Sequence, residues 1–183
     1  MANVSDLVAH LGEGDDRAFS AIVAAYQAQV FRWALALTGD QDEADDVAQE
    51  VFVRVFRKRR GYRGDGSFDG WLYRITSRVA GRARTKAMRT TILNTANDVY
   101  VTDPGARVDR QRAIALIRTI ADSLPVRQRE VFILCDLEGR TPAQAADMLE
   151  MKDVSVRASL FKARAAIRRQ ILATHPCYRE GTS

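Results

Sequence analysis

The sequence predicts an all-α protein made of two small helical domains joined by a linker. Apolar residues recur at steps of three and four through the first half and again from residue 109, which is the period of a buried helix face. Residues 90–106 contain no Lys or Arg, two Asp and a Pro-Gly pair, and they keep no sustained period. A Thr-Pro-Ala-Gln sequence at residues 141–144 predicts a new helix start within the second domain. The expected boundaries are 1–89 and 109–175 for the domains, 90–108 for the linker and 176–183 for a tail.

The composition is typical of a globular protein without a membrane anchor. Of 183 residues, 46% are hydrophobic, which is ample for buried cores. There is no basic segment followed by an apolar one, and no apolar run approaches a membrane span, so we expect a cytoplasmic protein without membrane insertion. Cys135 and Cys177 are expected to be free thiols, and the only histidines, His10 and His175, lie near the termini. We therefore expect no metal site, no cofactor and no catalytic group.

The net charge of +5 is distributed unevenly. Residues 1–50 hold ten Asp or Glu against two Arg, whereas residues 51–90 hold twelve Lys or Arg against two Asp. Because acidic surfaces attract cations and basic surfaces attract phosphates, this distribution predicts two different partners. One is expected to carry basic groups and the other phosphates.

Three helices are expected before residue 60. A short helix covers Val4 to Leu11, Asp15 caps a second helix that Gly39 ends, and a third helix opens at Asp40. The positions expected to face inward share the helical period. They are Phe19, Ile22, Val23, Tyr26, Val30, Trp33, Ala34 and Leu37 in the second helix, and Ala44, Val47, Ala48, Val51, Phe52, Val55 and Phe56 in the third.

The polar face of the third helix carries acidic residues toward its N-terminus and basic residues toward its C-terminus. It consists of Asp46, Gln49, Glu50, Val53, Arg54 and Arg57. This order either complements the helix dipole or serves a basic partner. A third alternative is a metal-dependent enzyme that acts on nucleic acid through the carboxylates between Asp42 and Glu50, although such a site needs carboxylates that converge from different elements.

The region from Tyr62 to Arg89 combines a glycine-rich loop, aromatic residues and a row of arginines. Ser67 is expected to cap a helix that has Asp69 in its first turn. The expected buried face is Phe68, Trp71, Leu72, Ile75 and Val79, and the neighbouring stripe is Arg74, Arg78, Arg82 and Arg89. A cationic row beside aromatic side chains favours a nucleic acid whose bases can be unstacked.

A solvated arginine face and aromatic residues that serve packing alone form the alternative for this helix. Salt bridges along the helix do not explain the row, because no acidic residue occurs between Asp69 and Asp98.

The second half predicts a helix-turn-helix unit. A helix is expected from Asp109 through Leu124, and Pro125 starts another that ends at Gly139. Thr141 and Gln144 form a capping box for a short helix to Leu149. After a turn, Asp153 or Ser155 caps a last helix whose inner face is Val156, Leu160, Ala163, Ile167 and Ile171.

The second helix of such a unit lies in the major groove of DNA, with residues near its N-terminus at the base edges. From Lys152 to Arg169 there are six Lys or Arg and one Asp, which favours DNA over a helical hairpin that serves packing alone. The candidate base-reading residues are Ser155, Arg157, Ala158, Ser159 and Lys162, and Arg164, Arg168 and Arg169 are placed for phosphates.

Together these stretches resemble a bacterial σ70-family sigma factor of the extracytoplasmic-function (ECF) group. DEADDVAQEVFVRVFR is similar to the segment that docks on the coiled coil of the polymerase β′ subunit. FDGWLYRI with its arginine row is similar to the segment that melts and binds the −10 element. SLPVRQREVFILCDLEGRTPAQAADMLEMKDVSVRASLFKARAAI resembles the domain that reads the −35 element. The resemblance implies a factor that binds core RNA polymerase and promoter DNA, catalyses no reaction, and is restrained by an anti-sigma factor.

The resemblance also implies roles for individual residues. The polymerase contact, on the β′ coiled coil, falls on Asp46, Gln49, Glu50 and Val53. The −10 contact falls on Tyr62, Arg63, Asp65, Ser67, Phe68, Trp71, Arg74, Arg78 and Arg82. The −35 contact falls on Thr141, Ser155, Arg157, Ala158, Ser159, Lys162 and Arg164, in a domain that also meets the polymerase β flap. Since short side chains at Ala158 and Ser159 stand where relatives often have long donors, an unusual −35 preference is expected.

A stand-alone helix-turn-helix regulator is the main rival for this chain. Such a protein binds its operator tightly without polymerase, whereas a sigma factor needs the core enzyme. The metal-dependent enzyme is the second rival, in which loss of Asp46 and Glu50 abolishes turnover instead of polymerase binding.

Overall fold

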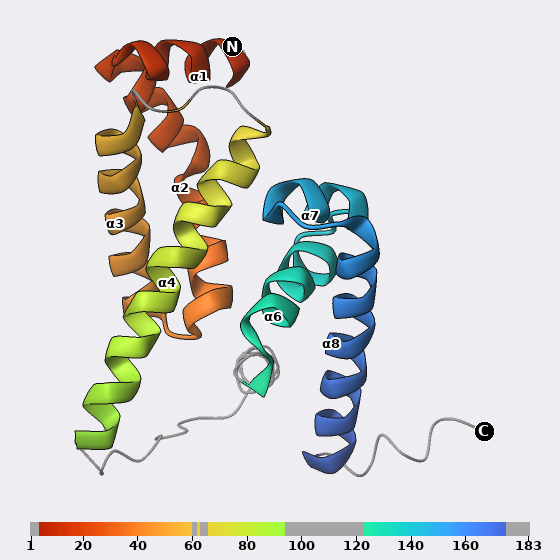
Figure 1. Ribbon diagram of the computed structural model, residues 1–183. Helices are drawn as coiled ribbons and strands as arrows, with labels where there is room; N and C mark the ends of the chain where they lie inside the picture. The colour runs from red at the N-terminus through yellow and green to blue at the C-terminus, as the bar shows by residue number, and fades with distance from the viewer. Residues whose placement is uncertain (1–3, 60–61, 63–65, 94–122, 175–183) are drawn as a thin grey trace, which may run out of the picture. The chain divides into compact units, whose positions relative to one another are not determined.

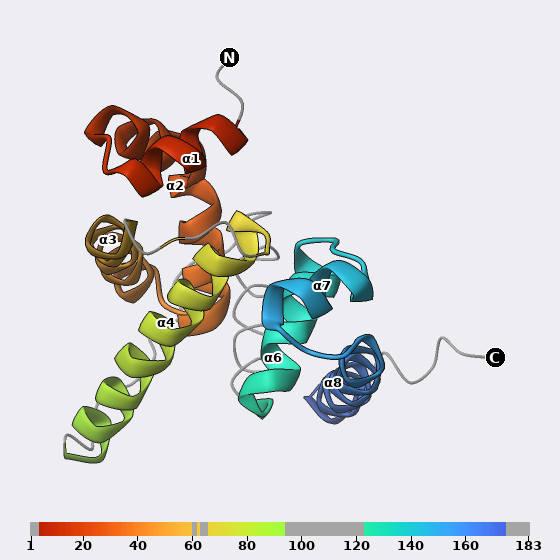
Figure 2. The ribbon, with the colours of Figure 1, turned by 45° about the horizontal axis from the view of Figure 1, so that its top comes forward.

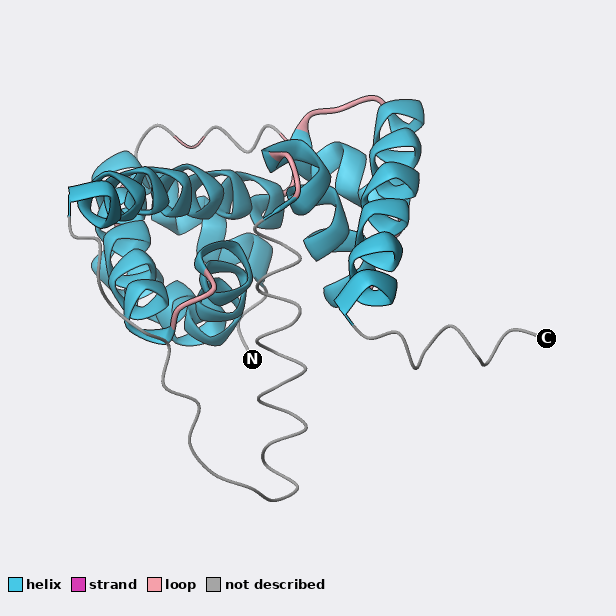
Figure 3. Ribbon diagram, turned by 90° about the horizontal axis from the view of Figure 1, so that it is seen from below, coloured by secondary structure: helices cyan, strands magenta, loops and turns pink. Residues whose placement is uncertain are grey.

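Two helical units make up the structure, a computed structural model that describes residues 4–59, 62, 66–93 and 123–174. The first unit is built on α1 (Val4–Glu13), α2 (Asp16–Thr38), α3 (Gln41–Lys58) and α4 (Phe68–Leu93). The second is built on α6 (Val126–Phe132), the π-helical turn η2 (Ile133–Leu137), α7 (Pro142–Leu149) and α8 (Asp153–Thr174). Only helices, turns and loops occur in these ranges, which confirms the all-α fold (Figure 3).

The first unit is organised around α2, which packs against α1, α3 and α4. In Figures 1 and 2, α2, α3 and α4 form a bundle and α1 lies across one end of it. Trp33 of α2 and Tyr73 of α4 are fully buried at the centre, with ring centroids 5.1 Å apart in an edge-to-face arrangement. These aromatic residues anchor α4 on the scaffold and so set the direction of its exposed face.

Local signals place the helix starts of this unit where the sequence predicts them. Asp15 accepts a hydrogen bond from the Arg17 backbone N–H at 2.8 Å, and Asp40 accepts one from Glu43 at 2.9 Å. The Ser67 Oγ accepts the Gly70 N–H at 3.2 Å at the start of α4. Each such cap contributes about 1 kcal/mol to its helix.

The expected inward faces are confirmed at most positions and wrong at a few. Ala44, Val47, Val51 and Val55 of α3 are buried, but Phe52 is only partly buried and Phe56 is 39% exposed. Trp71, Phe19 and Val23 are partly exposed as well. The apolar stripe of α3 is wider than the contact with α2 and α4 can cover, so its edge remains at the surface.

The first half of α4 buries the other expected residues, Phe68, Leu72, Ile75 and Val79. The helix continues through Leu93, so residues 90–93, which were expected in the linker, belong to α4. The rest of that linker, the helix expected from Asp109 through residue 122 and the tail lie outside the described residues.

In the second unit the predicted capping box is present. The Thr141 N–H donates to Gln144 Oε1 at 2.9 Å, and the Gln144 N–H donates to Thr141 Oγ1 at 3.2 Å. Val156, Leu160 and Ala163 of α8 are buried as expected, whereas Ile167 and Ile171 are partly buried. Asp153 or Ser155 as the cap of α8 is wrong: both lie inside the helix, and the Asp153 carboxylate binds Arg157 instead.

The π turn η2 changes the register before Gly139. The Glu138 N–H donates to the Ile133 carbonyl, five residues back, at 2.9 Å. Leu137, the last residue of this wider turn, is 43% exposed although it lies three residues after the buried Leu134. In the part of the chain that the structure describes, no helix combines the length and apolar character needed to cross a membrane.

Candidate partner and nucleic-acid interfaces

The four residues expected to contact a basic partner lie on one side of α3. Asp46 and Gln49 are exposed, and Val53 is 43% exposed. Glu50 is partly buried, and its Oε1 accepts from Arg54 Nε at 2.7 Å. Spacings of three and four bring the four together, and Asp42 and Asp45 extend the acidic surface toward the start of the helix.

An apolar groove of about 810 Å³ runs between α2 and α3 beside this acidic surface. Its walls come from both helices, and Gln49 and Val53 belong to the groove as well as to the predicted contact face. The residues that line it are Phe19, Val23, Gln27, Ala28, Phe31, Asp45, Ala48, Gln49, Phe52, Val53 and Phe56. A groove of this volume and lining can hold the apolar face of a helix.

The sequence does not predict the groove, because the helical period places Phe52 and Phe56 on the inward face of α3. The signal was present, since α3 has more large apolar residues than a helix with two neighbours can bury.

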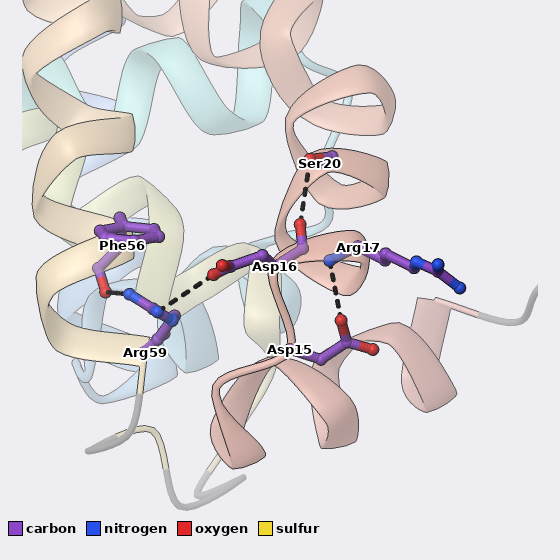
Figure 4. Close-up of polar contacts among 6 residues, drawn as sticks. All are labelled: Asp15, Asp16, Arg17, Ser20, Phe56 and Arg59. Atoms are coloured by element: carbon purple, nitrogen blue, oxygen red, sulfur yellow. Dashed lines mark hydrogen bonds and ion pairs between the residues drawn. The ribbon is translucent and has the colours of Figure 1, made fainter.

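One end of the groove is held by Arg59, the residue that follows α3 (Figure 4). Its guanidinium carbon lies 3.5 Å from the centroid of the Phe56 ring, and Nη1 donates to the Phe56 carbonyl at 2.7 Å. Nη2 reaches Asp16 Oδ1, at the start of α2, at 3.2 Å. Phe56 also meets Phe19 with ring centroids 5.1 Å apart. Arg59 therefore ties the two helices together and fixes the aromatic ring that lines the groove.

The start of α4 carries an aromatic cluster formed by Tyr26, Tyr62, Phe68 and Trp71. The centroid of the Tyr62 ring lies 4.9 Å from that of Trp71 and 5.6 Å from that of Phe68. The centroids of the Phe68 and Tyr26 rings are 5.2 Å apart. Phe68 and Tyr26 are buried, whereas Tyr62 and Trp71 are partly exposed. Partly exposed rings backed by buried ones make a rigid platform on which an unstacked base can stack.

A hydrogen bond fixes this cluster to the scaffold. The Tyr26 hydroxyl donates to Asp69 Oδ1 at 2.9 Å, which ties the first turn of α4 to α2. Ser67 is exposed next to the cluster and caps α4. Arg63 and Asp65 lie outside the described residues.

The arginine row continues from this platform along α4. Arg74, Arg78 and Arg82 follow one another at steps of four, and Arg78 and Arg82 are exposed. No acidic residue follows Asp69 within α4, so the helix offers its own arginines no carboxylate beyond the first turn. Arg78 and Arg82 therefore present positive charge on the helix that carries the aromatic platform, whereas the Arg74 side chain is only 19% exposed.

In the second unit, the α8 residues predicted for the −35 contact lie between Ser155 and Arg164. Ser155, Arg157, Ala158, Lys162 and Arg164 are exposed, and Ser159 is partly exposed. Thr141 is exposed at the start of α7, where it serves the capping box. The exposed set agrees with the face expected to meet DNA.

Two exposed apolar side chains on the same helix were missed. Phe161 and Val154 are each 76% exposed, although sequence reasoning gave them no role. Phe161 follows the buried Leu160, and its position outside the inward spacing was the available signal. An exposed aromatic ring on a DNA-reading helix can contact a thymine methyl group.

The two arginines of this face, Arg157 and Arg164, are held by carboxylates. Arg157 Nε donates to Asp153 Oδ2 at 2.6 Å. Arg164 binds Asp136 of η2 through two bonds, from Nε at 3.0 Å and from Nη2 at 2.6 Å. These hydrogen bonds, together with the negative charge of each partner, raise the pKa of both guanidinium groups above the ordinary value.

The carboxylates of α3 do not converge with ligands from other elements. Among residues 4–59, 62, 66–93 and 123–174, no three His, Cys, Asp or Glu side chains are grouped closely enough to hold a metal ion.

Comparison with known proteins gives matches over both units. Residues 22–90 match the family model of sigma-70 region 2, and residues 114–167 match that of sigma-70 region 4. The chain is 33% identical to the ECF RNA polymerase sigma factor SigE of Mycolicibacterium smegmatis, over 84% of this chain and 61% of that protein. It is 30% identical to the RNA polymerase sigma-H factor of Pseudomonas aeruginosa, over 95% of each.

A solved structure shares the fold. CnrH in complex with the cytosolic domain of CnrY superposes with a TM-score of 0.70 at 22% identity, covering 91% of this chain and 96% of that one.

Proposed function

Since the chain belongs to the ECF group of σ70-family RNA polymerase sigma factors, we propose that it binds core RNA polymerase, directs the enzyme to specific promoters and helps to melt the −10 region. The observation that carries this proposal is the pairing of surfaces in the first unit. There the adjacent helices α3 and α4 present an acidic face and a cationic face. A protein that joins a basic protein partner to DNA needs both surfaces at once.

The polymerase contact is assigned to Asp46, Gln49, Glu50 and Val53, together with the neighbouring groove. Carboxylates beside an apolar groove suit a helical partner that has apolar residues on one face and basic residues at its edge. The coiled coil of the β′ subunit is the proposed partner, and the β flap is the proposed contact of the second unit.

The −10 contact is assigned to the start of α4. Tyr62 and Trp71 offer ring faces to a base that has left the duplex, and Arg74, Arg78 and Arg82 hold phosphates of the separated strand. Stacking on aromatic rings contributes about 1–3 kcal/mol per base, which offsets part of the cost of unstacking it.

The −35 contact is assigned to α8, with Thr141 at the start of α7. Ser155, Ser159 and Lys162 supply polar groups, Arg157 and Arg164 supply guanidinium groups, and Ala158 supplies a methyl. This chemistry gives the factor a sequence preference, whereas RNA synthesis is carried out by the polymerase. The protein itself is a regulatory subunit that catalyses no reaction and acts in the cytoplasm.

An anti-sigma factor is a further proposed partner. The structure of CnrH was solved with the cytosolic domain of CnrY, and RpoE of Bartonella quintana was solved with the anti-sigma factor NepR. A protein that covers the α3 surface of this chain would prevent its assembly with polymerase.

In vitro transcription from a pool of random promoter sequences tests the proposal. Purified core polymerase is used with and without the chain, and the transcripts are sequenced. We expect transcripts that depend on the chain and share two upstream motifs. Tight DNA binding without core, and no transcript that depends on the chain, would instead establish a stand-alone helix-turn-helix regulator.

A further inference from the structure

A stripe of large side chains runs along α8 at steps of four, three and four, and consists of Arg157, Phe161, Arg164 and Arg168. We refer to it as the α8 stripe. Phe161 is 76% exposed, and the side chains of Arg157 and Arg164 are 64% and 60% exposed. The stripe is therefore an outward face of the second unit.

Arg164 is held differently from Arg157. Arg157 makes one bond to a carboxylate of its own helix, four residues earlier. Arg164 makes two bonds to Asp136, which lies 28 residues earlier on η2, and the Asp136 side chain is only 22% exposed. A carboxylate on a second element, with both oxygens engaged, fixes the plane of the guanidinium as well as its position.

This arrangement leaves the outer edge of the guanidinium available. An arginine has five N–H donors, and the pair with Asp136 uses Nε–H and one N–H of Nη2. The two donors of Nη1 and the second donor of Nη2 are not used by this pair. They form a fork of the kind that binds a guanine edge or a phosphate through two bonds.

The carboxylate also changes the electrostatics of the stripe. Asp136 neutralises the charge of Arg164 at close range, which weakens the general attraction of that arginine for phosphates. The N–H donors of Arg164 that do not bind Asp136 keep their fixed direction. A neutralised but oriented arginine binds poorly to DNA in general and well to one arrangement of acceptors.

We propose that Asp136 is a specificity-determining residue of this protein, which orients Arg164 for promoter DNA and at the same time lowers the affinity of α8 for other DNA. This inference rests on the proposed reading of DNA by α8. Asp136 is a positioning residue, because its carboxylate acts through Arg164 and not on the DNA.

The test compares holoenzymes reconstituted with the wild-type chain and with Asp136→Asn. The amide has nearly the same shape as the carboxylate but cannot accept both guanidinium bonds. Binding is measured on a promoter fragment that the wild-type holoenzyme selects and on the same fragment with its upstream motif scrambled. We expect the ratio of the two affinities to fall roughly tenfold, since a two-bond contact is lost. Binding to the scrambled fragment should strengthen, with a salt dependence steeper by about one ion.

Three further variants distinguish the orientation of Arg164 from a general change in charge and from a loss of folding. Asp147→Asn removes one carboxylate charge from α7 and should leave the affinity ratio within about twofold of wild type. Arg164→Lys keeps the charge without the fork and should lower the ratio as Asp136→Asn does. Asp136→Glu keeps the carboxylate and should restore most of the ratio. Melting temperatures show whether all variants fold.

Each failure has a different meaning. If Asp136→Asn behaves like Asp147→Asn, or if Arg164→Lys discriminates as well as wild type, the role of Asp136 is overturned while the proposed function stands. If the wild-type holoenzyme binds both fragments equally, reading of DNA by α8 fails, and this inference fails with it.

Discussion

The two helices that we propose to contact DNA, α4 and α8, carry their arginines in different ways. On α4, Arg78 and Arg82 are exposed on a helix that has no acidic residue after its first turn. On α8, Arg157 and Arg164 are each bound by a carboxylate within 3.0 Å. Arginines that have no carboxylate on their own helix can bind the phosphates of any DNA sequence. Arginines that a carboxylate orients and neutralises bind fewer arrangements of acceptors and so favour particular DNA sequences. With the proposed function, this difference assigns affinity for the opened strand to α4 and choice of promoter to α8.

The largest expected effect is on promoter opening. Replacing Arg74, Arg78 and Arg82 together with Ala should reduce open-complex formation roughly tenfold or more and lower its salt dependence by about two ions, because three phosphate contacts are lost. Permanganate footprinting of the −10 region over a range of salt concentrations measures both quantities. Binding to core polymerase should be unchanged, and Arg17→Ala on α2 serves as the control. If core binding fell as much as open-complex formation, the assignment of these arginines to DNA instead of to polymerase would be wrong.

The second largest effect is expected on assembly with core polymerase, through the acidic face of α3 that we propose as the contact. Replacing Asp46, Gln49 and Glu50 with Ala should weaken assembly with core polymerase about tenfold, because charged and polar contacts at the centre of an interface are lost. Fluorescence anisotropy of the labelled chain with core, in the absence of DNA, measures the affinity. Asp6→Asn, which removes an exposed carboxylate from α1, should have no effect. Unchanged assembly in the triple variant would remove the main support for this docking surface.

A smaller effect is expected where the helix-turn-helix begins. Thr141→Ala removes the side-chain half of the capping box and should lower the free energy of unfolding by about 1 kcal/mol. In a unit of this size, that corresponds to a fall of about 4–8 °C in melting temperature. Calorimetry measures the change. Thr141→Ser keeps the hydroxyl and should melt close to wild type, and equal losses in both variants would show that the hydroxyl is not the stabilising group.

The smallest effect is expected on the alkylation rate of Cys135, which lies next to Asp136 in the sequence. Burial, with a further contribution from Asp136, raises the pKa of the Cys135 thiol, although Arg164 opposes this shift. A higher pKa leaves less thiolate at a given pH, so iodoacetamide should alkylate Cys135 more slowly at pH 8 than it alkylates a small free thiol. The measurement uses a Cys177→Ser background and mass spectrometry. Alkylation as fast as that of the free thiol would contradict the raised pKa.

Features that depend on neighbours in the sequence were predicted correctly. The caps at Asp15 and Ser67 and the Thr141–Gln144 box each join residues two or three positions apart, so their pattern is complete in a short stretch. Most of the predicted face of α2, and Val156, Leu160 and Ala163 of α8, are buried for the same reason, since they follow the helical period.

Features that depend on how elements pack could not be read from the sequence. Whether Phe52 and Phe56 are core or groove is decided by the width of the contact between α2 and α3. The bond between Asp136 and Arg164 joins residues 28 positions apart, and no local pattern marks it. Asp153 illustrates a local competition, in which the carboxylate binds an arginine one turn later instead of capping the helix.

The π turn η2 has a consequence for how such a factor can diverge. A π turn inside a helix is equivalent to an α-helix that carries one inserted residue. Loss of a single codon between Ile133 and Leu137 can therefore restore a regular helix, which turns the residues on one side of the deletion by about 100° relative to those on the other. Asp136 or its replacement then no longer meets Arg164, although α8 itself is unchanged. With the proposed role of Asp136, a change in length outside α8 is thus a route by which descendants of one gene can acquire different promoter choices.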